Sequence, residues 1–295
     1  MHPYSCCRWI CLSTVIAVCS VAVANASDSH QFQYRAPLVG ERVIQWVNIN
    51  SNLKSTIRQK NQIVSSEDRR LQSEQLREIT ILETSNANSS KVRLTYAKAQ
   101  SVDTSDPRKP QFQPQAVANK SYLVSRQGEE LVVTDLDGKT PPADELRIVK
   151  SNMQSVGKSN PLTVFLRDRT VRVGETLEMP KELAAELLSG ADGAGGVQRV
   201  ALQLREVRTV EGVQCAEFQV MIEGGQGVQD AQSGTLVVET ATCRSRRFDL
   251  DSTLATAEQR GPSGNTFTVS NRGKVRVAVK AAYRDASVAN STKVR

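Results

Sequence analysis

Two serine–lysine pairs are the residues whose spacing could support nucleophilic catalysis. Ser51 with Lys54 and Ser155 with Lys158 each match Ser-x-x-Lys, in which the lysine deprotonates a serine nucleophile in penicillin-recognising enzymes. That chemistry needs a serine at a helix start and two partner motifs, Ser-Asp-Asn and Lys-Thr-Gly. Ser51 lies in strand-like sequence, Ser155 lies near the end of a predicted helix, and neither partner motif occurs. We interpret both matches as coincidental.

Residues 1–26 hold four of the six cysteines and one of the two histidines. Arg8 precedes an apolar run that ends at Ala24-Asn25-Ala26, the pattern of an export signal cleaved before Ser27. A lipid-modified Cys19 is the alternative, but the preceding Val18 is large where lipoprotein processing needs a small residue. The run is also shorter than the about 20 apolar residues of a membrane-spanning helix. We predict an exported protein of the bacterial cell envelope, periplasmic or secreted, with no transmembrane anchor after cleavage.

Cys215 and Cys243 are the cysteines that follow the predicted signal. In the predicted strand 213–222, Ala216 and Phe218 belong to the apolar face, which places Cys215 on the polar face. A disulfide between the two cysteines is the prediction in an oxidising compartment, with a stabilisation of about 3 to 4 kcal/mol. Two free thiols are the alternative, because the sequence does not give the separation of the two Cα atoms.

His30, the remaining histidine, lies close to the predicted mature N-terminus. A histidine-based triad, a Cys–His pair and a His-ligated zinc site are therefore not expected. Asp135-Leu136-Asp137-Gly138 is similar to a calcium loop, but the register places Val133 and Asp144 at its first and last ligand positions, so we predict a β-turn. The sequence predicts no catalytic residue, no metal site and no cofactor.

Six basic residues in the last third predict a basic patch. Three of them alternate with valines along the final predicted strand, and three more precede it. Such a patch would make weak contacts with anionic surfaces, and the alternative is a solvated strand face on which lysines discourage edge pairing. The residues are Arg244, Arg246, Arg247, Lys274, Arg276 and Lys280.

Composition narrows the classes of partner. The chain of 295 residues has a net charge of +7, but aromatic residues make up only 4% of it. Basic and aromatic residues do not interleave as they do in proteins that stack on bases, so nucleic acid is not an expected partner. Trp46 is the one tryptophan after residue 26, and we expect it to be buried in a central strand. A buried tryptophan argues against stacking on sugar rings.

The hydrophobic period is mostly two, which predicts strands. Residues 42–50 suit a central strand, and turns near Asn86 and Gly128 suit hairpins. Residues 67–77 have charges that suit a helix but run into a strand-like segment, and we favour a strand. Short turns in the last third predict antiparallel neighbours. The predicted strands there are 200–207, 213–222, 235–239, 248–256 and 266–281, and the predicted helices are 142–157 and 180–188.

These elements predict a β-dominated α+β protein with a curved antiparallel sheet or half-barrel and two short helices. Residues 27–284 form the predicted β-rich domain, in which the proline-containing stretch 103–115 is a candidate joint between subdomains. Residues 285–295 are predicted to form a disordered tail.

Three segments carry a resemblance. Residues 120–124, 131–138 and 171–177 resemble segments of uncharacterised exported bacterial proteins rich in β-strands. Those proteins have no established active site, so the resemblance transfers no functional residue. The predicted order of strands and helices is also similar in outline to the half-barrels of bacterial lipoprotein carriers, which hold an acyl chain between a curved sheet and helices. That similarity implies a fold and does not fix a function.

Three functions are compatible with these observations. The first is a non-catalytic binding or interaction module that contacts an envelope protein. The second is a carrier of a lipid or other apolar ligand, which predicts a cavity lined by aliphatic residues. The third is a hydrolase that uses carboxylates or a Ser–Lys pair, and the missing motifs leave little support for it.

Overall fold

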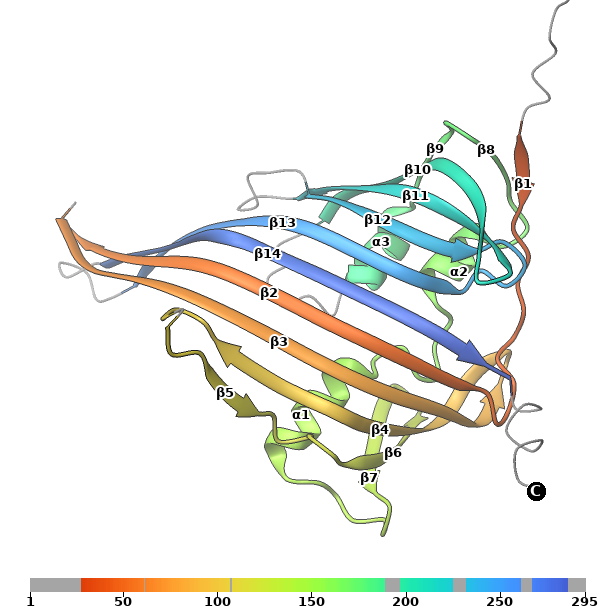
Figure 1. Ribbon diagram of the computed structural model, residues 1–295, viewed down its shortest axis with the longest axis horizontal. Coiled ribbons are helices and arrows are strands. Elements are labelled where there is room, and N and C mark those ends of the chain that lie inside the picture. Colours follow the sequence, from red (N-terminus) through yellow and green to blue (C-terminus); the bar gives the residue numbers. More distant parts are fainter. Residues whose placement is uncertain are drawn as a thin grey trace, which may run out of the picture.

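The computed structural model describes residues 28–60, 62–106, 108–188, 197–224, 232–260 and 267–285. The predicted signal and nearly all of the predicted tail lie outside these ranges. Within them, a twelve-stranded antiparallel sheet dominates, with the order β7-β6-β4-β3-β2-β14-β13-β12-β11-β10-β9 and β5 paired to β4 (Figure 1). The sheet is not closed, because its edge strands β7 and β9 do not pair with each other. The β-dominated α+β class is confirmed.

The first half of the sheet is a series of hairpins. Asn86 and Ala87 adopt positive φ in the β3–β4 turn, and Gln127 pairs with Glu130 around the next predicted turn. Both hairpins are confirmed, and residues 67–77 lie in a strand. The strands are β2 Arg42–Gln59, β3 Gln62–Ser85, β4 Asn88–Asp103, β5 Gln111–Pro114, β6 Ser121–Gln127 and β7 Glu130–Asp135.

The second half contains the strands predicted for the last third of the chain. They pair in sequence order as antiparallel neighbours, as the short turns predicted. A separate two-stranded sheet joins β1 Ser29–Gln31 to β8 Thr170–Arg172. The other strands are β9 Thr176–Glu178, β10 Val197–Val210, β11 Val213–Gly224, β12 Gln232–Glu239, β13 Ser245–Arg260 and β14 Phe267–Arg284.

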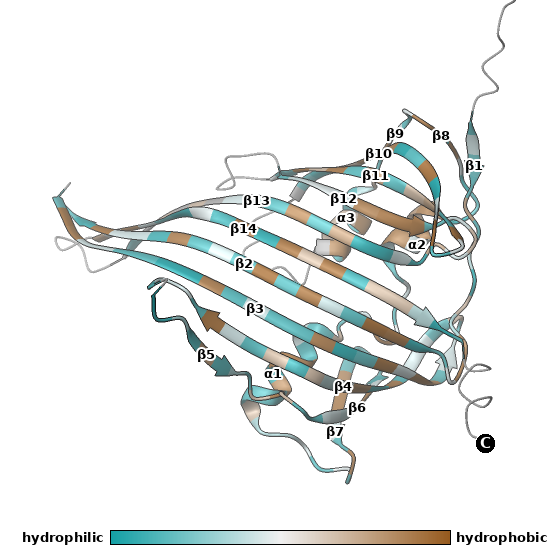
Figure 2. Ribbon diagram, in the orientation of Figure 1, coloured by the Kyte–Doolittle hydropathy of each residue, from teal (hydrophilic) through white to brown (hydrophobic). Residues whose placement is uncertain are grey.

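The two halves join where the first long strand pairs with the last. β2 and β14 are antiparallel along their whole length, from Arg42 opposite Arg284 to Gln59 opposite Phe267. Hydrophilic and hydrophobic residues alternate along these central strands (Figure 2). Successive strand residues point to opposite faces of a sheet, so the alternation gives the central sheet one apolar and one polar face.

Three helices lie on one face of the sheet, which we call the inner face (Figure 1). α1 Ala143–Asn152 and α3 Lys181–Leu188 correspond to the two predicted helices. α2 Pro161–Leu166 was not predicted; Asn160 begins it, with its Oδ1 accepting a hydrogen bond from the Leu162 backbone at 2.9 Å. None of the helices among the described residues has the length and apolar character needed to cross a membrane.

Two hydrophobic clusters cover the two sides of the inner face. The α2–α3 cluster packs α2 and α3 against the second half of the sheet, and includes Phe32, Phe165 and Phe218. The α1 cluster packs α1 against β4, β6 and β7, and includes Tyr96 and Tyr122. The central strands β14, β2 and β3 lie between the two clusters.

Candidate functional site

A cavity of about 430 Å³ lies over the central strands, between α1 and α2. Val43, Ile79 and Val279 contribute apolar side chains from β2, β3 and β14. Met153, at the end of α1, and Val164, in α2, line it from the helical side. This volume falls within the range of about 300 to 1,000 Å³ that is typical of small-molecule sites.

The strand register shows why the inner face is apolar here. One row of directly opposed residues runs through Phe218, Leu236, Phe248, Val279 and Val47 on five neighbouring strands. On β3 and β4 the same row continues with a glutamine and an alanine. The apolar floor therefore extends from the α2–α3 cluster to the middle of the sheet and becomes polar at β3.

The apolar floor continues beyond the cavity. Ile49 lies on the same face of β2 as Val47, opposite Val277, and its side chain is 36% exposed. A second cavity of about 600 Å³ farther along the same strands is lined mostly by outer-face positions, among them Asn50, Lys274 and Arg276, so it does not belong to this floor. We call the cavity together with the partly exposed floor around Ile49 the groove.

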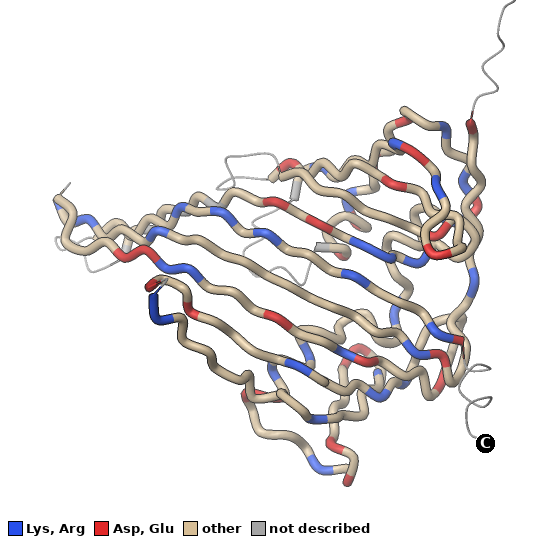
Figure 3. Tube along the Cα trace, in the orientation of Figure 1, with Lys and Arg blue, Asp and Glu red and all other residues tan. Residues whose placement is uncertain are grey.

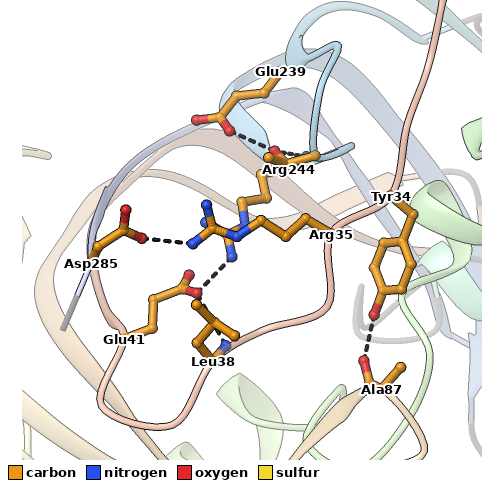
Figure 4. A network of polar contacts seen from close by, with 9 residues as sticks. Tyr34, Arg35, Leu38, Glu41, Ala87, Glu239, Arg244 and Asp285 are labelled. Carbon is orange, nitrogen blue, oxygen red and sulfur yellow. Dashed lines mark hydrogen bonds and ion pairs between the residues drawn. The ribbon is translucent and has the colours of Figure 1, made fainter. Parts of the chain in front are cut away.

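Residues 32–41 close one end of the groove, and we call them the strap. The Gln33 backbone donates to the Thr240 carbonyl at 2.8 Å, and the Gly40 backbone donates to the Ile81 carbonyl at 2.8 Å. Between these points, the hydroxyl of Tyr34 donates to the carbonyl of Ala87 in the β3–β4 turn (Figure 4). The strap thus connects the second half of the sheet to the first across the end of the cavity.

A buried ion pair holds the base of the strap. A guanidinium nitrogen of Arg244 lies 2.6 Å from Glu41 Oε2, and both side chains are almost fully buried (Figure 4). Arg244 also stacks on the ring of Tyr283, with Cζ 4.9 Å from the ring centroid. Burial raises the pKa of Tyr283, which stays a neutral phenol at physiological pH. Because both charges are out of water, losing one partner would leave the other uncompensated.

A polar layer borders the groove on the α1 side. Asn152 Nδ2 donates to Tyr96 Oη at 2.8 Å and to Gln75 Oε1 at 3.2 Å. Arg77, opposite Tyr96 on β3, is 7% exposed, and its Nε has no hydrogen-bond partner. Burial lowers the pKa of Arg77, and interaction with Tyr96 partly opposes that effect. Burial likewise raises the pKa of Tyr96.

A buried carboxylate fixes α1 to the sheet. Lys120 Nζ and Tyr122 Oη each donate to Glu145 at 2.7 Å. Burial raises the pKa of Glu145, but these hydrogen bonds lower it more, so the net pKa lies below the ordinary value. Burial and the neighbouring carboxylate raise the pKa of Tyr122. This network gives the α1 cluster a polar edge.

The two cysteines lie on different faces of the sheet. Cys243 belongs to the α2–α3 cluster on the inner face. Cys215 has the opposite orientation to Ala216 and Phe218, and lies directly opposite Glu239 and Arg208 on the outer face. Both cysteines are buried free thiols, so the predicted disulfide is not present in the structure. Cys215 lies on the strand face that was predicted to be polar, but it is buried there.

The structure divides the predicted basic patch. Arg244 is buried beneath the strap, and Arg246 pairs with Glu239 at 2.6 Å. The other four residues occupy the outer-face positions of β13 and β14, where Lys and Arg recur along both strands (Figure 3). Asp249 and Asp251 pair with two of these four. The four outer-face residues are Arg247, Lys274, Arg276 and Lys280.

The expectation that Trp46 is buried is wrong. Trp46 is 45% exposed on the outer face, between Lys280 of β14 and Leu76 of β3. β2 is a central strand, as predicted, but the helices cover only its inner face. The argument against sugar recognition that relied on a buried tryptophan therefore no longer applies.

The Ser-x-x-Lys pairs do not meet the geometry that the motif needs. Ser51 and Lys54 lie on opposite faces of β2, and Ser155 follows the end of α1. Asp135 Oδ1 accepts hydrogen bonds from the Asp137 and Lys139 backbones at 2.9 and 2.8 Å, which is the predicted β-turn. Over the described part of the chain, no three Cys, His, Asp or Glu residues are grouped as metal ligands.

Sequence reasoning missed the strap and Arg77. The strap has no periodic hydrophobic pattern, because it connects β1 to β2 and is neither a helix nor a strand. Arg77 did carry a signal: it has the same parity as Ile79 and Ile81 on β3, which places it on the apolar face.

Comparisons with known proteins give distant likenesses of fold. No protein-family model and no curated protein sequence matches the chain. A structure concerned with lipid–protein interactions in lipovitellin is similar over 86% of this chain, with a TM-score of 0.39 and 8% identity. The match spans 26% of the lipovitellin chain. A LolA superfamily protein from Nitrosomonas europaea is similar over 81% of this chain and 86% of its own, with a TM-score of 0.15 and 7% identity. Neither assigns a site residue here.

Proposed function

We propose that this is a non-catalytic, exported protein of the bacterial cell envelope that binds and carries an apolar ligand in the groove. The proposed export rests on the sequence of residues 1–26 alone. The proposed lack of catalysis rests on the missing catalytic motifs in the sequence. The groove itself supplies the argument for the ligand.

One observation carries the proposal: the aliphatic floor continues past the helices that cover it. Inner-face residues within the two clusters are buried, whereas Ile49 in the middle of the same face is 36% exposed. A contiguous apolar surface exposed to water is unfavourable by about 25 cal/mol per Å², and such surfaces commonly mark binding sites. An acyl chain or similar ligand would cover this floor.

The ligand should be held mainly by its apolar surface. Each methylene group transferred from water contributes about 0.8 kcal/mol, which is about fourfold in affinity. Affinity for a series of chains should therefore rise with length until the groove is filled.

Native mass spectrometry of protein purified from a bacterial envelope tests this proposal. We expect a chain that begins at Ser27 and carries a lipid-sized adduct, which organic extraction removes. The extracted protein should then bind the neutral fluorescent probe N-phenyl-1-naphthylamine. A bare chain that also fails to bind this probe would contradict the carrier function.

A matched pair of variants locates the binding. Ile49→Glu puts a charge on the open floor, and we expect it to weaken probe binding at least tenfold, because burying an unpaired charge costs several kcal/mol. Ile63→Glu is the control, since Ile63 is 61% exposed near the start of β3 and does not line the cavity. Equal loss in both variants would assign the effect to general destabilisation.

A second candidate function is an interaction surface on the outer face, and the exposed Trp46 favours it. Tryptophan is among the residues that most often dominate protein interfaces. Leu76 and Lys280 flank it in the register. A photocrosslinking residue in place of Trp46 would then capture one partner of defined mass in intact cells, while the same residue at exposed Leu136 would not.

A further inference from the structure

Arg77 is a buried cation without a carboxylate partner. It is 7% exposed and its Nε lacks a hydrogen-bond partner; within the described part of the chain Tyr96, and not an Asp or Glu, is the group that interacts with its charge. Gln45 and Tyr96 are directly opposite it on the neighbouring strands. A buried ion normally needs an opposite charge or a full set of hydrogen bonds. The Nε–H group of Arg77 therefore lacks a hydrogen-bond acceptor.

Arg77 lies next to the cavity, so a ligand bound there can supply the acceptor. Gln45, Ile79 and Asn152 line the cavity, and they lie next to Arg77 in the register and through the hydrogen bond from Asn152 to Tyr96, although Arg77 is not itself a lining residue. On the other side of Arg77, Val47 and Ile49 continue the floor towards the open part of the groove. Arg77 therefore lies beside the apolar floor, next to the residues that line the cavity.

We infer that Arg77 binds the oxyanion headgroup, carboxylate or phosphate, of an amphiphile whose apolar chain occupies the groove. This inference rests on the proposed function and adds the chemical class of the ligand. The planar guanidinium suits both oxyanions, because its N–H groups match the spacing of two acceptor oxygens. The amide group of Gln45 is a further hydrogen-bond donor beside it, whereas both N–H groups of Asn152 are already bonded to Tyr96 and Gln75.

The burial of Arg77 makes the contact selective. Water screens a charge little at a buried side chain, so an oxyanion gains more from Arg77 than it would from an arginine at the surface. An uncharged headgroup makes no ion pair with Arg77, although it must lie beside the same polar residues, Tyr96 and Asn152. The groove should therefore prefer charged over uncharged amphiphiles of equal chain length.

Three probes of equal chain length test this inference: palmitic acid, hexadecyl phosphate and hexadecanol, titrated into extracted protein at pH 8. We expect at least one charged probe to bind the native protein tenfold or more tightly than hexadecanol. The charged probe that binds more tightly shows whether carboxylate or phosphate is the preferred headgroup.

Two variants and a control assign the preference to Arg77. Arg77→Met should abolish the preference and leave hexadecanol binding unchanged, whereas Arg77→Lys should keep part of it. Because Arg77→Met removes an unpaired buried charge, the melting temperature should stay the same or rise. Arg93→Met is the matched control on β4, where Arg93 is exposed, and it should behave like the native protein.

The outcomes separate the two proposals. Equal binding of all three probes by the native protein would overturn the role of Arg77 and leave the carrier function standing. A preference that persists in Arg77→Met would also overturn it. Failure to bind any of the three probes would overturn both.

Discussion

The two clusters on the inner face differ in chemistry. Every member of the α2–α3 cluster is apolar or a thiol, and two of its rings, Phe32 and Phe218, have centroids 5.7 Å apart. The α1 cluster instead contains Tyr96 and Tyr122, whose hydroxyls are hydrogen-bonded. We infer that the first cluster mainly stabilises the sheet, whereas the second also supplies the directional groups that border the groove.

The largest expected effect comes from breaking the apolar cluster. Phe218→Ala should lower the free energy of unfolding by about 3 to 5 kcal/mol, because it removes a fully buried ring and leaves a cavity. Urea unfolding measures the change. Phe112→Ala is the control, since Phe112 is 65% exposed, and it should change stability by less than about 0.5 kcal/mol. A similar small change in both variants would contradict the role given to this cluster.

An intermediate effect is expected from the polar edge of the α1 cluster. Glu145→Gln should lower stability by about 1 to 3 kcal/mol at pH 7, because Lys120 and the buried hydroxyl of Tyr122 would no longer donate to a charged carboxylate. Burial raises the pKa of Glu145 but its hydrogen bonds lower it further, so the net pKa is depressed in the folded state. Its stabilisation is therefore complete above the unfolded pKa of about 4.3 and is lost as the pH falls through the folded pKa.

The pH dependence of that variant sharpens the comparison. The stability difference between the native protein and Glu145→Gln should be constant from pH 7 to about pH 5 and shrink at lower pH. The corresponding change at exposed Glu129 should have no such profile. A difference that does not vary with pH would mean that Glu145 is not charged in the folded protein.

The smallest effect is expected from reductant. Cys215 and Cys243 are free thiols, so dithiothreitol should shift the melting temperature by less than about 1 °C, and packing alone should hold the α2–α3 cluster. Burial and then Asp168 raise the pKa of Cys243 to about 11, and burial raises that of Cys215. A thiol reagent should therefore label neither cysteine in the folded protein and both in urea. Labelling that appears only after reduction would restore the predicted disulfide.

Local rules predicted much of the fold. Alternation identified the long strands, the turn residues near Asn86 and Gly128 identified hairpins, and Pro142 and Pro180 marked the starts of α1 and α3. α2 was missed because six residues are too few for a helical period, although Asn160 followed by a proline is a recognised helix start.

The groove depends on information that lies outside any one segment. Near its start β2 has apolar residues on both faces, with Ile44 and Trp46 alternating with Val43 and Val47, so this part of its sequence does not say which face the helices cover. That choice follows from pairing with β14 and from the position of α1 and α2. Arg77 was overlooked for the same reason. Its alternation with its neighbours on β3 shows burial only once the inner face of the sheet is known.

The pairing of β2 with β14 has a consequence for how the molecule folds. A chain made from its N-terminus folds early segments first, and β2 can pair with β3 at once, yet it lacks its second partner until the last strand, β14, is available. Contacts so distant along the chain are slow to form, and until then β2 presents eighteen residues of unpaired edge. Such edges recruit other strands. The folding intermediate should therefore need protection from aggregation, and the groove can receive a ligand only after β14 has joined.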